Sequence, residues 1–218
     1  TATTVIYTLS LHDALPISLT GRFAALTNFR DPSSNRGGAP SRGALVKDFL
    51  EQRDRPLAYL ERIAKGGAAY NGFNLLVGDR SGGLYCYSNR RPEIEGLKPG
   101  VHGLSNRFLD TPWPKVERGK AALARVGSSL RIDPEAVLEI LSDRTRPPVD
   151  LLPDTGVGEA WERVLSSIFI TSPTYGTRSS SVLLVGRDGK VDFVERTFIP
   201  EGESVRVEET RRFCFEIR

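Results

Sequence analysis

The stretch RSSSVLLVGRDGKVDFVERTFI, residues 178–199, decides the fold class. An apolar run is followed by Asp188 and Gly189, and a second run then alternates apolar and polar side chains. An Asp-Gly pair between two strand-like runs predicts a β-hairpin, because these residues tolerate the positive φ that tight turns require. Two further runs, SSIFI at 166–170 and RRFCFEIR at 211–218, are also predicted to be strands.

A second hairpin is predicted near the middle of the chain. NLLVGD, residues 74–79, and LYCYSN, residues 84–89, are joined by RSGG, which has the small residues of a turn. Upstream, LTGRFAALTN at 19–28 has the composition of a further strand. Hairpins without repeated crossover units favour antiparallel sheets.

Four amphipathic segments are predicted to be helices. Ser41 is expected to cap the first of them, and Asp133 the last. Pro56 opens the second, whose apolar positions 57, 60, 63 and 64 recur at helical spacing and whose end is marked by Gly66 and Gly67. The four segments are 42–52, 56–65, 115–126 and 134–143. With the hairpins they predict an α+β fold in which helices pack on sheet faces.

The composition is that of one ordinary globular domain, with 218 residues, 39% of them hydrophobic and 26% charged. With 30 basic and 27 acidic residues the net charge is only +3, so nucleic acid is not an expected partner. Cys86 and Cys214 have no Cys or His at metal-ligand spacing, which argues against a metal site and a disulfide scaffold. No apolar run approaches the roughly 18 residues of a membrane span, and no targeting pattern is present. A cytoplasmic location is therefore expected.

Residues 1–18, TATTVIYTLSLHDALPIS, differ in character from the rest. They begin without Met, and YTLSLHDALPI resembles translated sequencing adapter. We therefore expect a non-native leader at 1–18 and one domain at 19–218. The alternative is a genuine strand, because TVIYTLSL alternates well enough to pair. Residues 4–9 are then expected to cover an apolar sheet edge that would otherwise invite aggregation.

Asparagines near predicted strand ends are candidates for a binding site. Asn71 and Asn74 surround Gly72, where a tight turn at a strand entry explains them equally well. In GLSN, residues 103–106, Asn106 is expected to end a short strand and to point its amide into a cleft as an oxyanion donor. Turn geometry is again the alternative.

Arg178 is the best candidate for a functional charge, because it is the only charged residue between Phe169 and Val185. In a strand that leads into the core its guanidinium needs a carboxylate or a bound anion. The alternative is an arginine at a strand start with its head in water.

The segment DTPWP, residues 110–114, is predicted to be a stiff elbow. Thr111 and Trp113 precede prolines, which disfavours helical angles at both, and a helix is expected to begin near Pro114. We predict that this elbow places Asn106 within hydrogen-bond reach of Arg178 or of its partner.

A serine nucleophile is not expected. The serines at 179–181 lack a G-x-S-x-G elbow, and His102 is the single histidine beyond the first eighteen residues. His102 is expected to be a solvated or hydrogen-bonded loop residue. Cys86 and Cys214 have no adjacent activating base and are expected to be core or strand-face thiols.

The motifs SRGALV, YNGFNLLVGD, YSNR, GVHGLSN, LDTPWPKV, YGTRSSSVLLV and ERTF together resemble the transport and Golgi organisation protein 2 family, also called the NRDE family. The resemblance covers about residue 19 to the C-terminus. Two landmarks of the family are absent, the cysteine after the initiator Met and the Asn-Arg-Asp-Glu segment. The resemblance therefore indicates a truncated family member.

The resemblance implies a four-layer αββα sandwich of the N-terminal nucleophile hydrolase type, incomplete at its N-terminus. In such hydrolases an N-terminal cysteine attacks an amide or ester carbonyl, with its own α-amine as base. The resemblance implies catalytic roles for Asn106, as an oxyanion or substrate-orienting amide, and for Arg178, which would hold a carboxylate or the nucleophile's surroundings. The implied binding residues are Asn28, Asn71, Asn74, Trp113 and Tyr175. Without its nucleophile the chain is expected to bind a small molecule but to be inactive.

A non-enzymatic protein that binds or moves haem or lipid is the alternative that the resemblance leaves open. No cofactor is expected beyond haem as a ligand. The axial candidates are His102, Cys86, Cys214, Tyr70 and Tyr175, and none has a neighbourhood that recommends it.

Overall fold

The computed structural model describes residues 17–80, 83–129, 131–201 and 204–218. These residues form two compact units, a first unit of residues 17–111 with Arg218 and a second unit of residues 112–217. The predicted edge pairing of residues 4–9 lies outside the described residues, as does all but the end of the predicted leader.

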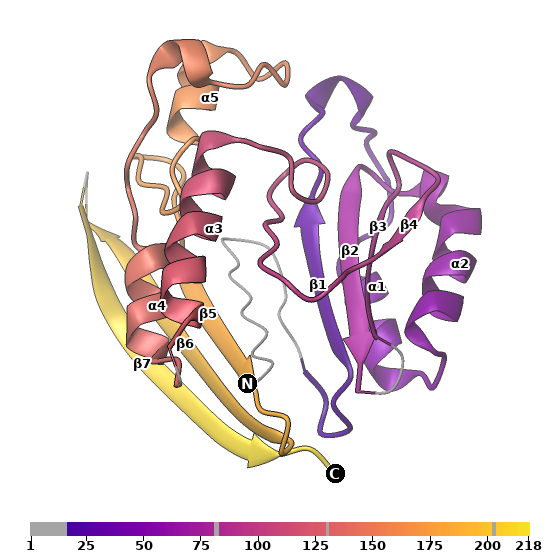
Figure 1. Cartoon of the computed structure of the whole chain (residues 1–218). Coiled ribbons are helices and arrows are strands. Elements are labelled where there is room, and N and C mark those ends of the chain that lie inside the picture. The colour runs from indigo at the N-terminus through magenta and orange to yellow at the C-terminus, as the bar shows by residue number, and fades with distance from the viewer. Residues whose placement is uncertain (1–16, 81–82, 130, 202–203) are drawn as a thin grey trace. The chain divides into compact units, whose positions relative to one another are not determined.

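The first unit is built on a four-stranded antiparallel sheet with the strand order β1-β2-β3-β4 (Figure 1). The strand predicted at 19–28 is confirmed over its last six residues. The central hairpin is confirmed too, with Asn74 opposite Ser88 and Val77 opposite Tyr85. The strands are β1 (Phe23–Asn28), β2 (Phe73–Asp79), β3 (Gly83–Ser88) and β4 (Ile94–Gly96).

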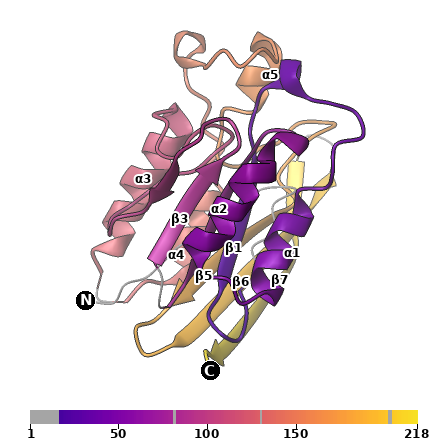
Figure 2. The ribbon, with the colours of Figure 1, turned by 90° about the vertical axis from the view of Figure 1, so that its right-hand side faces the viewer.

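Helices α1 (Gly43–Glu51) and α2 (Pro56–Gly66) pack on this sheet (Figure 2). Phe49 of α1 and Tyr59 of α2 are completely buried, and their rings meet edge to face with centroids 5.1 Å apart. Phe73 and Leu75 of β2 complete the centre of this core. Removal of these large apolar side chains from water is the main stabilising contribution to the unit.

The helix termini agree with the predicted signals in one helix but not in the other. The second predicted helix begins at its proline and ends at its glycines, as expected. The predicted Ser41 cap of α1 is wrong, because the N-cap is Arg42, which already has helical angles (φ −71°, ψ −20°) and makes no side-chain cap bond. Among the apolar positions that recur at helical spacing, Leu60 is completely buried, whereas Leu57 is 40% exposed; Tyr59 is also completely buried.

The second unit is built on a three-stranded antiparallel sheet with the order β5-β6-β7. The Asp-Gly hairpin is confirmed: residues 186–189 join β5 to β6, and the amide of Gly186 donates to the carbonyl of Lys190 at 2.8 Å. Gly189 has a φ of 83°, the conformation that favours glycine at this turn. The strands are β5 (Ser179–Val185), β6 (Lys190–Glu201) and β7 (Ser204–Glu216).

Helices α3 (Pro114–Gly127) and α4 (Pro134–Leu141) cover one face of this sheet (Figure 1). The predicted cap of α4 is confirmed, because the Asp133 carboxylate accepts the amide hydrogen of Glu135 at 3.1 Å. The core between α4 and the sheet contains Val137, Leu138, Leu141, Val182 and Val194. The remaining helices are α5 (Glu159–Val164) and short 3-10 helices at Pro32–Ser34, Gly67–Ala69 and Val149–Leu151.

The strand predicted at 166–170 is wrong, because this segment is a turn. The amide of Phe169 donates to the carbonyl of Asp143 at 2.8 Å, and the amide of Ile170 donates to the hydroxyl of Thr177 at 2.9 Å. These bonds satisfy the backbone without a strand partner. The apolar composition of the segment therefore reflects its burial.

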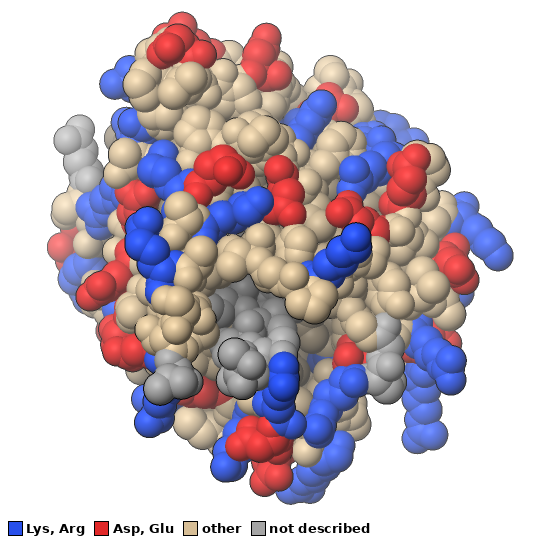
Figure 3. Space-filling model, in the orientation of Figure 1, with Lys and Arg blue, Asp and Glu red and all other residues tan. Residues whose placement is uncertain are grey.

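Each unit consists of helices on one face of an antiparallel sheet, which confirms the α+β class. The four-layer sandwich also depends on how the units sit together, and it stays a prediction. None of the helices in the described ranges combines the length and apolar composition that a bilayer crossing needs. Lysines and arginines are interspersed with acidic residues on the face drawn in Figure 3.

Replacement of Asp133 by Ala is expected to lower the free energy of unfolding by about 1 kcal/mol, because the amide of Glu135 loses its acceptor. Asp133→Asn keeps an acceptor oxygen and is expected to stay within about 0.5 kcal/mol of the parent. Urea unfolding followed by circular dichroism measures both. Equal losses in the two variants would contradict the capping role.

Candidate functional site

Three strand ends of the first unit meet at one edge of its sheet. β1 ends at Asn28, β2 begins opposite it at Phe73, and β3 ends at Ser88 opposite Asn74. Loop 103–110 lies against these ends, because its carbonyls accept hydrogen bonds from side chains of β1 and β2. We call this region the strand-end site.

Asn74 lies completely buried within the strand-end site. Its Nδ2 donates to the carbonyl of Arg107 at 2.8 Å and to the hydroxyl of Thr27 at 3.0 Å. The Thr27 hydroxyl donates in turn to the carbonyl of Ser105 at 2.8 Å. By contrast, Oδ1 of Asn74 is buried and has no hydrogen-bond partner within the described part of the chain. Such an acceptor costs about 1–3 kcal/mol, so a donor on a ligand would be stabilising here.

Asn106 ties loop 103–110 to the end of β1. Its Nδ2 donates to the carbonyl of Asn28 at 2.9 Å, and its own carbonyl accepts the amide hydrogen of Arg30 at 2.7 Å. The prediction that GLSN ends a strand is wrong, because residues 103–106 are loop and their bonds run to these segments instead of a strand ladder. Asn106 nevertheless lies beside the two strand ends that carry Asn28 and Asn74.

Loop 103–110 is closed at its base by Asp110. Oδ1 of Asp110 accepts the amide hydrogen of Gly103 at 2.8 Å, and Oδ2 lies 2.7 Å from Nδ1 of His102. Nε2 of His102 lies 2.9 Å from the carbonyl oxygen of Lys98, so His102 is a hydrogen-bonded loop residue, as predicted. Asp110 has a φ of 55°, in the left-handed region that side chains rarely adopt. Its carboxylate bonds hold this strained position and fix the loop.

Asn71 and Asn89 hold the backbone around the start of β2. Oδ1 of Asn71 accepts the amide hydrogen of Arg36 at 2.8 Å, and its Nδ2 donates to the carbonyl of the same residue at 3.1 Å. Oδ1 of Asn89 accepts the amide hydrogen of Phe73 at 2.9 Å, while its Nδ2 donates to the carbonyl of Gly67 at 3.0 Å. Both asparagines therefore anchor backbone around the site.

Arg90 runs close against the backbone of the strand-end site. Its Nη2 donates to the hydroxyl of Ser34, and its Nε is buried with no partner within the described ranges. A Cβ added at Gly72 would lie 2.9 Å from this Nε and 2.9 Å from Cβ of Phe29. Only glycine allows this approach, so Gly72 determines where the guanidinium of Arg90 packs.

Pattern-based prediction missed the arginines and Asn89 of this site, although a signal was present. Ser-Asn-Arg occurs three times, at 34–36, 88–90 and 105–107, and TNFR at 27–30 is a near match. All four runs contribute bonds to the strand-end site. The recurrence of one polar tripeptide at separate turns marks segments that the fold brings together.

The other predicted residues belong to the second unit. Trp113 is extended (φ −69°, ψ 145°) directly before α3, which confirms the predicted extended angles of this residue and the helix start at Pro114. Tyr175 packs edge-on against Trp161 with ring centroids 6.0 Å apart. Arg178 precedes β5 and is exposed, which agrees with the alternative in which its head lies in water. Because Asn106 and Arg178 lie in different units, their proximity stays a prediction.

Comparison with known proteins identifies the family. A family model described as Transport and Golgi organisation 2 matches residues 15–200. The chain belongs to this family. It is 38% identical to the Transport and Golgi organization protein 2 homolog of Bos taurus, over 85% of this chain and 71% of the relative. The homolog of Homo sapiens is 36% identical over 94% of this chain and 78% of the relative. The family resemblance drawn from the motifs is thus confirmed.

Neither thiol of this Transport and Golgi organisation 2 family member is placed as a nucleophile. Burial raises the pKa of the Cys86 thiol to about 12, and the charge of Glu95 adds a smaller increase. Cys214 is exposed on β7, with Sγ 3.6 Å from Oδ1 of Asp192. The reactive form is the thiolate, so Cys86 is inert near neutral pH. The described residues contain no group of three or more His, Cys, Asp or Glu placed to hold a metal ion.

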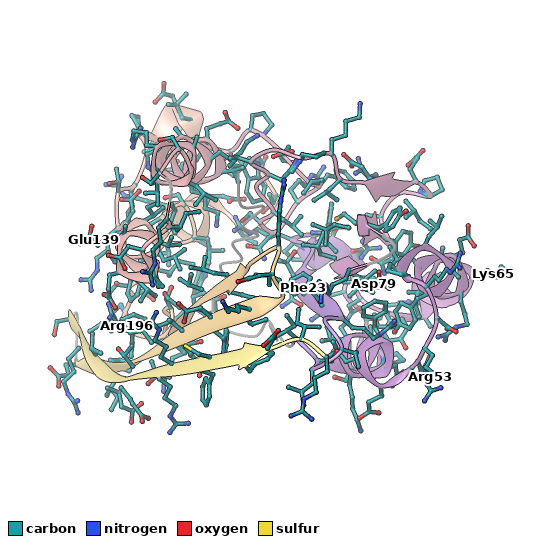
Figure 4. The ribbon with its side chains drawn as sticks, turned by 60° about the horizontal axis from the view of Figure 1, so that its bottom comes forward. Phe23, Arg53, Lys65, Asp79, Glu139 and Arg196 are labelled. Atoms are coloured by element: carbon teal, nitrogen blue, oxygen red, sulfur yellow. The ribbon has the colours of Figure 1, made fainter. Side chains whose placement is uncertain are left out.

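A cavity of about 550 Å³ lies at the opposite end of the same sheet. Arg22, Arg53 and Asp79 are among its lining residues, and Figure 4 shows Phe23 and Asp79 at this end. Arg22 is already engaged, because it donates to the carbonyl of Phe49 at 2.9 Å and lies 4.0 Å from Asp79. None of the predicted site residues lines this cavity, so the strand-end site remains the candidate.

Gly72→Ala is expected to lower the free energy of unfolding by about 1–3 kcal/mol, because its Cβ would overlap Arg90 and Phe29. Gly66→Ala is the matched control, since no atom lies within 4 Å of an added Cβ there and φ is −111°. The control is expected to be neutral or slightly stabilising. Urea unfolding measures both, and a neutral Gly72→Ala would refute the close packing.

At pH 8 the native chain is expected to react quickly with DTNB at one thiol, Cys214. With a pKa of about 12, roughly one Cys86 thiol in ten thousand is ionised at this pH. Cys86 is therefore expected to react only after unfolding in denaturant. Cys214→Ser should abolish the rapid absorbance change, whereas Cys86→Ser should preserve it. Two rapid thiols in the native protein would contradict the burial of Cys86.

Proposed function

We propose that the chain is a relative of the N-terminal cysteine hydrolases and that its strand-end site binds a small amide or ester. The observation that carries this proposal is the buried, unpartnered Oδ1 of Asn74 beside Asn106. A substrate amide has an N–H that needs an acceptor and a carbonyl that needs donors. An orphan acceptor close to a fixed side-chain amide suits such a group.

Asn106 is suited to orient the substrate carbonyl. One Nδ2 hydrogen is used by the carbonyl of Asn28, which sets the plane of the amide. The second hydrogen can donate to a carbonyl oxygen that becomes negative during attack. Because the bonds of Arg30 and Asp110 already fix the loop, this donor needs little reorganisation in the transition state.

The proposal gives the strand-end site the roles of binding and orientation, without bond formation. The family resemblance implies a cysteine after the initiator Met, whose α-amine has a reference pKa of about 7.7–8.0 and can act as base. Cys86 and Cys214 lack such a base, and Cys86 is held in its thiol form by burial. An attacking thiol must therefore come from an N-terminal cysteine of the kind that the resemblance implies.

The proposal extends to a four-layer αββα sandwich. In each unit the helices cover one face of the sheet. Leu76 of β2 and Leu183 of β5 alternate with residues that pack on helices, so they point to the faces without helices. Both side chains are nevertheless buried, which supports further packing on these faces.

A family member that begins Met-Cys tests the hydrolase proposal. Its hydrolysis of short N-acyl amides and esters is followed by chromatography, and replacement of the N-terminal cysteine by Ala is expected to reduce the rate at least about a thousandfold. A Cys→Ser variant keeps a weaker nucleophile and is the matched control. Turnover that survives in the Ala variant would remove the hydrolase proposal.

A carrier of haem or lipid is the alternative, and two of its candidate iron ligands, His102 and Cys86, are poorly suited to bind iron. Both ring nitrogens of His102 lie in hydrogen-bond contacts, at 2.7 and 2.9 Å. The raised pKa of Cys86 disfavours the thiolate that ligates haem iron. These observations disfavour iron ligation by His102 and Cys86.

A further inference from the structure

The guanidinium of Arg107 packs on two phenyl rings at the strand-end site. Its Cζ lies 4.9 Å from the ring centroid of Phe29 and 5.4 Å from that of Phe108. The two centroids are 5.0 Å apart, and Phe29 is only 6% exposed, so the stacking surface is fixed in the core. Within the described part of the chain, these rings are the contacts of the guanidinium, and no hydrogen-bond or ion-pair partner accompanies them. A stacked guanidinium with unused N–H donors is prepared for a bidentate oxyanion.

Two more guanidiniums lie near these rings, and they differ in what they already bind. Cζ of Arg91 is 4.8 Å from the centroid of Phe108, and its Nη2 pairs with Glu95 at 2.6 Å, so its charge is balanced. Arg90 donates to the hydroxyl of Ser34, and the buried Nε atoms of both Arg90 and Arg91 have no acceptor within the described ranges. Because Glu95 balances the charge of Arg91, Arg90 and Arg107 are the arginines whose charge is left for an anion.

One carboxylate, Asp31, interacts with these two arginines. Hydrogen bonds from Ser34 and Ser33 hold the pKa of Asp31 below its usual value, and the charges of Arg90 and Arg107 act in the same direction. The Ser33 hydroxyl lies 2.7 Å from Oδ1, so a neutral donor satisfies this oxygen. The two guanidinium groups and the one carboxylate sum to a net charge of one positive unit, which favours the binding of an anion.

We propose that Arg107 and Arg90 form a subsite for an oxyanion, a carboxylate or phosphate group of a small ligand. Loop 103–110 holds the subsite in place, because Asn74 binds the carbonyl of Arg107 at 2.8 Å and Asp110 closes the loop. This support reduces the side-chain freedom that binding would otherwise remove. The subsite goes beyond the proposed hydrolase function, since anion binding requires no nucleophile.

Calorimetric titration of the intact chain with sodium phosphate and, separately, with sodium acetate at low ionic strength tests the subsite. We expect saturable binding of at least one anion at one site per chain. In Arg107→Gln the affinity is expected to fall about tenfold or more, because a charge-assisted pair is lost. The anion that binds more tightly identifies the ligand group as phosphate or carboxylate.

Arg53→Gln is the matched control for loss of one charge. Arg53 is exposed and lines the cavity at the opposite end of the sheet (Figure 4). This variant is expected to bind like the parent. Arg107→Lys keeps the charge but loses the planar fork, and an intermediate affinity is expected. Both Arg107 variants keep the carbonyl that Asn74 binds, and circular dichroism verifies their fold.

Three results would overturn the subsite proposal. They are no saturable binding of either anion to the parent, equal anion affinity in the parent and Arg107→Gln, or a loss of anion affinity in Arg53→Gln equal to that in Arg107→Gln. The last result would indicate general attraction to positive charge. Failure of the proposed function is distinguishable, because an inactive Met-Cys family member would leave the anion affinities of this chain unchanged.

Discussion

The buried amide of Asn74 is the group on which the strand-end site depends. Its donors must find acceptors away from water, and the acceptors come from two other segments, Thr27 in β1 and the carbonyl of Arg107 in loop 103–110. Without this amide the carbonyl of Arg107 would lose its donor, at a cost comparable to a lost hydrogen bond. One side chain thus couples two strands to the loop that carries Asn106.

Local chemistry made much of the fold predictable. The Asp-Gly turn between β5 and β6 and the Asp133 cap of α4 each depend on a few neighbouring residues, and both are found as expected. Predictions failed where contacts between residues far apart in the sequence determine the local structure. The run at 166–170 is apolar because it is buried, and its backbone bonds to Asp143 and Thr177 satisfy it without a strand partner. Composition alone does not distinguish these two reasons for an apolar run.

The sequence pointed to most asparagines of the candidate site but not to its arginines or to Asn89. Asn71, Asn74 and Asn106 stood out at predicted strand ends, where turn geometry was the alternative, and Asn28 came from the family resemblance; all four lie at the strand-end site. An arginine, by contrast, is usually a surface residue. The stacking of Arg107 on two rings follows from the closure of a loop by distant bonds, and no local pattern encodes that geometry.

Both the backbone conformation and the side-chain hydrogen bonds of Asp110 restrict which residue can occupy its position. Its left-handed backbone is tolerated best by Gly, Asn and Asp, while its two carboxylate oxygens serve Gly103 and His102 separately. Glycine would relieve the backbone and forfeit both bonds, whereas asparagine would keep an acceptor oxygen for the amide of Gly103 and present an NH₂ group to Nδ1 of His102. Few amino acids meet both demands, so natural variation around the loop is expected to be narrow at this position while neighbouring side chains diverge.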